Sequence, residues 1–361
     1  MKIIIASGGT GGHIYPGIAL AEAARRKKHE VIFITETNAL GKELISKEGW
    51  PLYTISVRPL IRKLSVGAVI APFFLKLAAI QSWLLMLKLK PNLVITTGGY
   101  CSLPVILAAW FARVPVMIQE QNSSLGLANR IGQNFAAKVC LAFKDTLGLK
   151  QWSKAVFTGN PLCERIFRAT REQGMARYQL DPSLRTLLVF GGSLGARKIN
   201  ETVPPLLDWL DEVKIQVVHI TGERDFGLIK SQTQKKSYPH YHLVEYEDEM
   251  GMALKAADLV VSRAGATAIS EILATGRPSI LVPYPFAADN HQVYNTRLLE
   301  HGGAAIEIPD RDLTPALLRE TIETLFENGG KLETMGQAAE SLFKTHAEDE
   351  IITIGEKLVG V

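Results

Sequence analysis

Cysteine is scarce in this chain of 361 residues, and Cys101, Cys140 and Cys163 have neither paired nor metal-ligand spacing. A disulfide-stabilised fold is therefore excluded, and this cysteine usage is typical of a reducing compartment. Low-complexity tracts and internal repeats are also lacking, which excludes fibrous and solenoid proteins. No signal peptide precedes the apolar residues 3–5, so we expect the N-terminus to form part of the fold.

Acidic residues are absent between Gly49 and Gln119, although the formal net charge of the whole chain is only +4. The same span contains a long apolar run at residues 66–90 and the cations Arg58, Arg62, Lys63, Lys76, Lys88, Lys90 and Arg113. An anionic membrane surface attracts such a region, by about 1 kcal/mol per Lys or Arg near the surface. We therefore predict peripheral membrane contact through residues 58–90. A buried helix with lysines at its ends is the alternative, whereas Pro72 and Lys76 argue against a spanning helix.

Short apolar runs alternate with helix-length segments along the chain, which indicates βαβ units and parallel strands covered on both faces. The predicted strands lie within residues 2–7, 30–35, 92–97, 114–119, 138–143, 186–192, 215–221, 242–246, 258–263, 278–283 and 304–309.

Residues 3–13 and 187–197 share one pattern, an apolar strand followed by a Gly-Gly turn, and each suits the first strand of a doubly wound domain. We predict an α/β fold with two Rossmann-like parallel-sheet domains that face a cleft. The domains are placed at residues 1–161 and 162–340, with a C-terminal helix in 341–361 packing back on the first domain.

The glycine run at residues 8–12 fits no common nucleotide motif. It is not a Walker A loop, it departs from G-x-G-x-x-G at Ile14, and Glu36 is a weak match for a ribose-binding acid. A nicotinamide enzyme is therefore disfavoured. Glycines still let backbone N–H groups approach a ligand, and the following helix offers its positive end to phosphate. Tight packing turns are the alternative explanation for these glycines.

Three further turns at predicted strand ends have similar chemistry, at residues 96–104, 190–200 and 261–271. Ser193 and the amides around Gly195 and Ala196 are candidates for holding a diphosphate. Glu271, one to two turns into a helix that starts near Ala266, is a candidate for the ribose hydroxyls or else a solvated helix residue.

The polar residues 289–292 follow a predicted strand and suit either sugar recognition or helix capping. Metal chemistry is poorly supported, because Asp310 and Asp312 precede a helix start and are explained better by capping. We predict no metal and no cofactor.

Seven motifs occur in order at residues 8–16, 98–104, 119–122, 159–161, 191–200, 262–271 and 289–295. Together they resemble the MurG family of peptidoglycan N-acetylglucosaminyltransferases over essentially the whole chain. The resemblance implies the two-Rossmann glycosyltransferase-B architecture and inverting transfer of N-acetylglucosamine from UDP-GlcNAc to the 4-hydroxyl of the muramoyl sugar of lipid I, an undecaprenyl-linked acceptor, to give lipid II. It further implies a peripheral protein at the cytoplasmic membrane face, a cell-wall synthesis complex as a partner, and no nucleic acid.

The resemblance also implies roles for individual residues. It places Ser193 at the diphosphate, Glu271 at the ribose, and the backbone near Tyr246 and Glu247 at uracil. Contacts with the rest of the substrates are implied for Thr10, Gly11, Gly12, Tyr100, Asn122, Ala266, Thr267, Ala268, Ile269, Ser270, His291 and Gln292. The acceptor hydroxyl needs a base, for which His13 is the first candidate and Glu120 the second.

The chain departs from the family pattern at Gln119, usually His, at Leu194, usually Gln, and at Cys163, near a usual Arg. Arg165 and Arg263 are the candidates to replace that missing cation. Three rival functions stay open: a glycolipid synthase that uses diacylglycerol, a hydrolysing UDP-GlcNAc 2-epimerase, and a catalytically weak scaffold.

Overall fold

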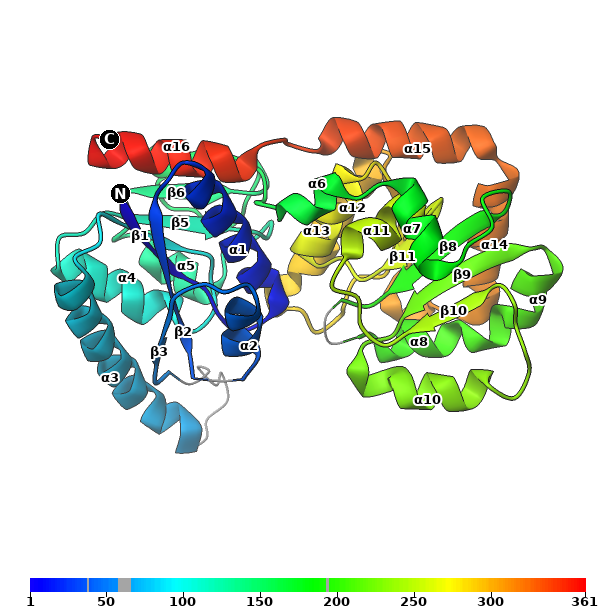
Figure 1. Cartoon of the computed structure of the whole chain (residues 1–361), viewed down its shortest axis with the longest axis horizontal. Coiled ribbons are helices and arrows are strands. Elements are labelled where there is room, and N and C mark those ends of the chain that lie inside the picture. The colour runs from blue at the N-terminus through cyan, green and yellow to red at the C-terminus, as the bar shows by residue number, and fades with distance from the viewer. Residues whose placement is uncertain (38, 58–65, 193–194) are drawn as a thin grey trace. The chain divides into compact units, whose positions relative to one another are not determined.

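A computed structural model of the chain describes residues 1–37, 39–57, 66–192 and 195–361. The chain divides into two compact units, the first formed by Met1–Cys163 with Lys344–Val361 and the second by Glu164–Phe343 (Figure 1). The predicted contributions of Ser193 and of the cations Arg58, Arg62 and Lys63, and the departure at Leu194, lie outside the described residues.

The first unit is built on a seven-stranded parallel sheet with the order β3-β2-β1-β4-β5-β6-β7. Its strands are β1 (Lys2–Ala6), β2 (Glu30–Glu36), β3 (Leu52–Ile55), β4 (Leu93–Thr96), β5 (Val116–Glu120), β6 (Lys138–Leu141) and β7 (Ala155–Phe157). Ile4 of β1 lies opposite Ile32 of β2 and Val94 of β4. These central residues are buried because helices cover both faces of the sheet, and this explains the continuous apolar runs.

Helices of the first unit connect these strands. They are α1 (Gly11–Arg26), α2 (Ala39–Lys47), α3 (Val66–Leu89), α4 (Ser102–Phe111), α5 (Leu127–Gly132) and the short η1 (Trp152–Lys154). The C-terminal helix α16 (Ala347–Val359) also belongs to this unit and packs against α1. Salt bridges from Arg26 to Asp349 (2.9 Å) and from Lys27 to Glu356 (2.7 Å) join the two helices.

The second unit contains a six-stranded parallel sheet with the order β10-β9-β8-β11-β12-β13. Its strands are β8 (Arg185–Phe190), β9 (Ile215–Ile220), β10 (Tyr241–Val244), β11 (Leu259–Ser262), β12 (Ser279–Leu281) and β13 (Ala305–Glu307). The predicted α/β class with two Rossmann-like parallel sheets is confirmed.

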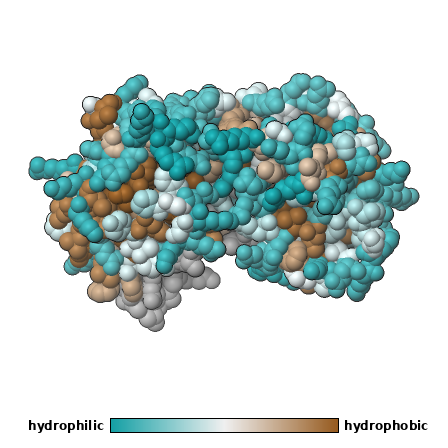
Figure 2. Space-filling view, viewed as in Figure 1, coloured by the Kyte–Doolittle hydropathy of each residue, from teal (hydrophilic) through white to brown (hydrophobic). Residues whose placement is uncertain are grey.

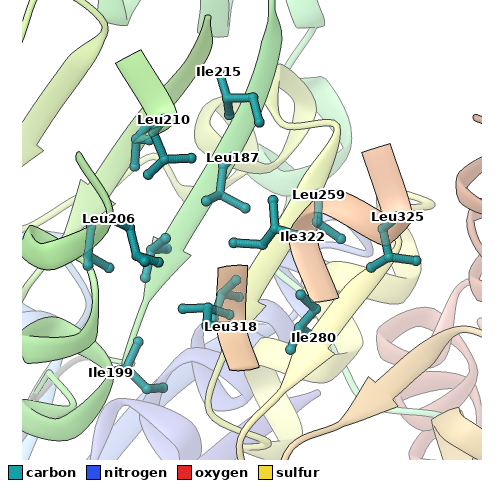
Figure 3. Close-up of a cluster of buried hydrophobic side chains, with 14 of the residues drawn as sticks. Leu187, Ile199, Leu206, Leu210, Ile215, Leu259, Ile280, Leu318, Ile322 and Leu325 are labelled. Carbon is teal, nitrogen blue, oxygen red and sulfur yellow. The ribbon is translucent and has the colours of Figure 1, made fainter. Parts of the chain in front are cut away.

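The helices of the second unit are α6 (Glu164–Arg168), α7 (Arg171–Tyr178), α8 (Arg197–Thr202), α9 (Leu207–Glu212), α10 (Glu223–Thr233), α11 (Met250–Ala256), α12 (Ala266–Ala274), α13 (His291–His301), α14 (Pro315–Glu327) and α15 (Gly329–Leu342). Short 3₁₀ turns lie at η2 (Pro204–Leu206), η3 (Ala288–Asn290) and η4 (Asp310–Asp312). One buried cluster packs Leu187 of β8 and Leu259 of β11 against Ile322 of α14 (Figure 3).

All eleven predicted strands are present, but β3 and β7 were not predicted from the sequence. Both are short edge strands with partly exposed residues, so they lack the continuous apolar run that marks a central strand.

Helix α3 has apolar side chains on two faces. Ala78 and Met86 are buried in the core of the first unit, while Phe73, Trp83 and Leu84 are 66%, 42% and 54% exposed. The alternative of a simply buried helix therefore does not hold. Brown and tan side chains follow α3 at the surface in Figure 2. Within the described part of the chain, no helix is both long enough and apolar enough to cross a membrane.

Candidate active site

The first glycine run connects β1 to α1 at the carboxyl edge of the first sheet. Helix α1 begins at Gly11, with Thr10 extended before it, so His13 lies in its first turn. Pro16 lies beyond that first turn, inside the helix. Tyr100, in the turn after β4, is 45% exposed, and Asn122 follows β5. Since β1, β4 and β5 are neighbours, these predicted residues lie on adjacent loops.

His13 is held between these loops by its Nδ1 atom, which lies 2.9 Å from the carbonyl oxygen of Thr97 and 3.0 Å from Oε1 of Gln121. The Gln121 amide is oriented by its Nε2, which donates to Thr97 O (2.6 Å) and to Oε1 of Gln119 (2.5 Å). Both partners of Nδ1 are thus acceptors, so this network assigns the proton of neutral His13 to Nδ1. Nε2 then carries a free lone pair and has no hydrogen-bond partner among the described residues. A partly exposed imidazole in this tautomer can accept a proton.

Gly98 leaves the space that this imidazole occupies. A Cβ atom at Gly98 would lie 2.8 Å from Nδ1 of His13, and the φ angle of +102° is one that other residues rarely adopt. Gly98, in the motif after β4, therefore leaves room for the His13 ring because it has no side chain.

Glu120, the second candidate base, is buried and engaged on both oxygens. Oε1 accepts hydrogen bonds from the backbone N–H (3.0 Å) and from Nδ2 (3.1 Å) of Asn122. Oε2 accepts from the N–H of Gly126 (2.9 Å) and from Nδ2 of Asn129 (2.8 Å). Four donors occupy the lone pairs of the carboxylate. Glu120 therefore holds the loop at residues 121–126 in place, and this geometry argues against its use as a base.

Glu36, at the end of β2, points into the glycine run. Its Oε1 accepts from the N–H of Gly9 (2.5 Å), and the residue is only 3% exposed. The carboxylate at the usual place of a ribose-binding acid is therefore used to hold the first loop, which agrees with the exclusion of a nicotinamide enzyme.

The corresponding loops of the second unit lie at the carboxyl ends of β8, β10, β11 and β12. Gly195 and Ala196 precede α8, and the turn is held where Asn200 Nδ2 donates to Thr221 O (2.9 Å). Helix α12 begins at Ala266, as the sequence predicted, and Thr267, Ala268, Ile269 and Ser270 form its first turns. Ser270 donates to Ala266 O (2.8 Å), so its hydroxyl is used within the helix.

Glu271 lies on α12 with a partly buried side chain. Burial raises the pKa of Glu271 to about 7, and the nearby Arg165 cation on α6 opposes part of that rise. Hydroxyl groups of a ligand that donate hydrogen bonds to this carboxyl would stabilise its ionised form. The two predicted ligands Arg165 and Glu271 are therefore close to each other.

The guanidinium group of Arg263 is hydrogen-bonded within the second unit. Nη1 donates to Oδ1 of Asp310 (2.5 Å) and to the carbonyl oxygens of Val282 (3.1 Å) and Pro283 (3.3 Å), and the residue is only 9% exposed. Between the two proposed replacements for the missing cation, this geometry favours Arg165. The capping role expected for Asp310 is wrong, because its side chain pairs with Arg263 and Thr314 caps the following helix.

The polar segment after β12 begins α13. His291 is the first helical residue, and Oε1 of Gln292 accepts from the N–H of Tyr284 (2.9 Å). Asn295 Nδ2 donates to Ala264 O (3.1 Å), which joins α13 to the turn before α12.

Comparison with known proteins identifies the family of this chain. The N-terminal domain of glycosyltransferase family 28 matches residues 3–141, and the C-terminal domain of that family matches residues 186–351. The chain belongs to glycosyltransferase family 28. The predicted glycosyltransferase-B architecture and glycosyltransferase class are confirmed by this match.

Curated relatives and solved structures agree with this assignment. The chain is 39% identical to the UDP-N-acetylglucosamine–N-acetylmuramyl-(pentapeptide) pyrophosphoryl-undecaprenol N-acetylglucosamine transferase of Halothermothrix orenii, over 99% of this chain and 98% of that protein. It is 36% identical to the Myxococcus xanthus protein of the same name, over 98% and 92% of the two chains. The crystal structure of Acinetobacter baumannii MurG matches with a TM-score of 0.77 and 27% identity over 99% of both chains. The predicted resemblance to MurG is thereby confirmed.

The S. aureus MnaA–UDP structure is similar at the level of the fold alone. It has a TM-score of 0.74 but only 14% identity, over 100% of this chain and 97% of that one.

Three residues that contact candidate site residues were not predicted from the sequence. Gln121 lies within the quoted motif at residues 119–122 but was given no role, although it orients His13. Arg177 and Tyr178 were missed entirely, although both bind the side chain of Glu247. No motif marks Arg177, because its partner lies 70 residues away in the sequence.

Among the described residues, one group has its possible metal-ligand atoms close together: His346, Glu348 and Asp349 at the start of α16. Asp349 also accepts a hydrogen bond from Arg26 (2.9 Å). These residues are distinct from every predicted substrate ligand.

Proposed function

We propose that this chain transfers N-acetylglucosamine from UDP-GlcNAc to the 4-hydroxyl of the muramoyl sugar of lipid I, with inversion, to give lipid II. The observation that carries the proposal is similarity over nearly the full length to transferases of that name, at 36–39% identity. The tautomer of His13 supports a role as base, and the environment of Glu271 supports a role in binding the donor.

The proposed reaction uses His13 as the general base. The acceptor oxygen forms a bond to the anomeric carbon while the bond from that carbon to the UDP oxygen breaks. Nε2 of His13 takes the proton of the hydroxyl, and UDP leaves with the bonding electron pair. Positioned bases contribute about 10²–10⁴-fold to such reactions. Gln121 and Thr97 act as positioning residues, because their oxygens accept from Nδ1 and leave the lone pair of the neutral ring on Nε2.

Donor binding is assigned to the loops of the second unit. Glu271 accepts hydrogen bonds from the ribose, Arg165 contributes positive charge, and the first turn of α12 (Ala266, Thr267) faces the phosphates. Preorganised amides at a helix N-terminus stabilise developing negative charge, so no metal is required. Gln292 and His291 contact the sugar, and the backbone at Tyr246 and Glu247 pairs with uracil.

We assign the outer face of α3 to a peripheral contact with the cytoplasmic face of the membrane, where the lipid-linked acceptor resides. Lys76 and Lys88 are exposed beside Phe73, Trp83 and Leu84, and this combination suits an anionic interface. A cell-wall synthesis complex at the same membrane is the expected setting.

The proposal is tested by incubating the purified protein with UDP-GlcNAc and a lipid I analogue, with and without a chelator. We expect a lipid product that has gained one GlcNAc in both conditions. Absence of that product would refute the proposed transfer, and its complete loss with chelator would refute the metal-free mechanism. Parallel reactions with diacylglycerol, or with UDP-GlcNAc alone, would reveal a glycolipid synthase or an epimerase through their distinct products.

A further inference from the structure

The buried carboxylate of Glu247, in the loop between β10 and α11, is bound by several donors. Nε of Arg177 donates to Oε2 and Nη2 of Arg177 to Oε1, both at 2.8 Å, in a bidentate pair. The hydroxyl of Tyr178 donates to Oε2 (2.5 Å), and the N–H of Glu249 donates to Oε1 (2.7 Å). Burial and the bond to Glu247 raise the pKa of Tyr178, so this hydroxyl keeps its proton and remains a donor. Such charge-assisted, bidentate bonds hold a fixed geometry.

The backbone of the same residue is left open. Neither the peptide N–H nor the C=O of Glu247 has a hydrogen-bond partner among the described residues, although the residue is only 5% exposed. Buried peptide groups are almost always paired, so an open donor and acceptor on one buried residue indicate a ligand that supplies both partners.

Uracil has the required pattern, because its N3–H donates and the adjacent carbonyl oxygen accepts. Cytosine has the opposite pattern on that edge, with an acceptor at N3 and a donor at N4. A peptide group in a fixed position therefore discriminates between the two bases, whereas a mobile one discriminates less.

Helix α7 provides a rigid support for Arg177 and Tyr178. It packs so closely on α11 that a Cβ atom at Gly174 would lie 2.2 Å from the carbonyl oxygen of Met252. Arg177 and Tyr178 are the last residues of α7, so they connect this packed helix pair directly to the loop that precedes α11.

We propose that Arg177, Tyr178 and Glu247 form a positioning clamp that holds the peptide groups of Glu247 for uracil and so sets nucleobase specificity. The clamp rests on the proposed function, because it presumes a uridine nucleotide donor. Its residues act through the backbone of Glu247 and touch no reacting atom.

The test measures the affinities of UDP and CDP for the full-length protein by calorimetry, and takes their ratio. Inactive protein changes the apparent stoichiometry, and partial unfolding lowers both apparent affinities by the same factor, so the ratio of affinities reports specificity. Glu247→Gln and Arg177→Met remove the charged pair while keeping most of the side-chain volume. We expect each to reduce the UDP/CDP ratio about tenfold, the usual effect of one misplaced hydrogen bond in a recognition site.

Arg171→Met is the matched control. Arg171 lies on the same helix and pairs with Asp258 (3.1 Å) and with Ala256 O (2.9 Å), at the other end of α11. We expect this variant to lower the melting temperature but to leave the UDP/CDP ratio unchanged. An equal fall in the ratio for Arg171→Met and Arg177→Met would overturn the clamp, because loosening of α7 in general would then explain both.

A ratio that stays within twofold of wild type in Glu247→Gln and Arg177→Met would also overturn the clamp. If Glu247→Gln fails to fold, Tyr178→Phe removes one donor and should still reduce the ratio about threefold; an unchanged ratio there counts against the clamp. A wild-type protein that binds neither nucleotide, or binds both equally, would instead contradict the assignment of uracil to this loop, independently of any variant.

Discussion

The ionisation of Glu271 should affect the pH dependence of both the folding stability and the affinity for UDP-GlcNAc. In the unfolded chain this carboxyl ionises near its ordinary value of 4.5, whereas burial raises its pKa to about 7 in the folded protein. The folded state therefore favours the protonated form. Its contribution to stability is complete below about pH 4.5 and is lost as the pH rises through about 7.

The magnitude follows from the difference between the two pKa values. At about 1.36 kcal/mol for each pH unit, ionising Glu271 costs the folded state up to about 3 kcal/mol. This is an upper limit, because the side chain is only partly buried. Glu271→Gln has no titration at this site, so we expect its stability relative to wild type to increase between pH 4.5 and 7 and to stay constant above about pH 8.

Binding of the sugar donor should favour the ionised form of Glu271, whereas folding favours the protonated form. Ribose hydroxyls donate to the ionised carboxylate, so UDP-GlcNAc should bind wild type about tenfold more tightly at pH 8 than at pH 6. Calorimetry in buffers of different ionisation enthalpy should detect release of close to one proton near pH 6.

The variant Glu271→Gln serves as the control, because it removes only the carboxyl group of Glu271 and leaves the other residues unchanged. We expect it to bind UDP-GlcNAc more weakly than wild type at pH 8 and with little dependence on pH. Equal pH dependence of binding in wild type and Glu271→Gln would show that Glu271 is neither the group with the raised pKa nor the ribose ligand. That result would refute the reasoning.

Three further variants test the other assignments. His13→Ala should lower kcat at least about 100-fold but change UDP-GlcNAc affinity less than twofold, and an equal loss in both would make His13 a donor ligand. Glu120→Gln should lower the free energy of unfolding by about 1–3 kcal/mol through lost hydrogen bonding, and the melting temperature with it, while the pH profile of kcat stays as in wild type; a lost limb of that profile would restore Glu120 as a base. Replacing Lys76, Lys88 and Lys90 by Glu should reduce binding to anionic vesicles at least about 100-fold, as sedimentation can measure, and leave soluble donor binding intact.

A control for the vesicle experiment comes from the second unit, where Lys230 and Lys235 are exposed. Changing both to Glu alters the net charge without changing the outer face of α3. Vesicle binding that falls as much in this control as in the α3 variant would show that net charge alone, rather than α3, is responsible.

The sequence by itself determined the class of fold and the strand-end loops that carry the candidate site residues. Most of the eleven predicted strands are buried on both faces and must therefore be apolar, although the edge strand β10 is partly exposed. The candidate ligand loops were predicted because glycines and short polar residues follow strands directly. The edge strands β3 and β7 were missed because partly exposed residues carry no such pattern.

Tertiary structure decided which of the candidate residues are available for chemistry. His13 and Glu120 were both plausible bases in the sequence, but Nε2 of His13 is left open by Thr97 and Gln121, whereas Glu120 accepts four hydrogen bonds. Arg263 similarly proved to be paired with Asp310. A hydrogen bond between groups far apart in the chain depends on how the strands and helices pack, and this is why local residue patterns predicted the loops but not the contacts within them.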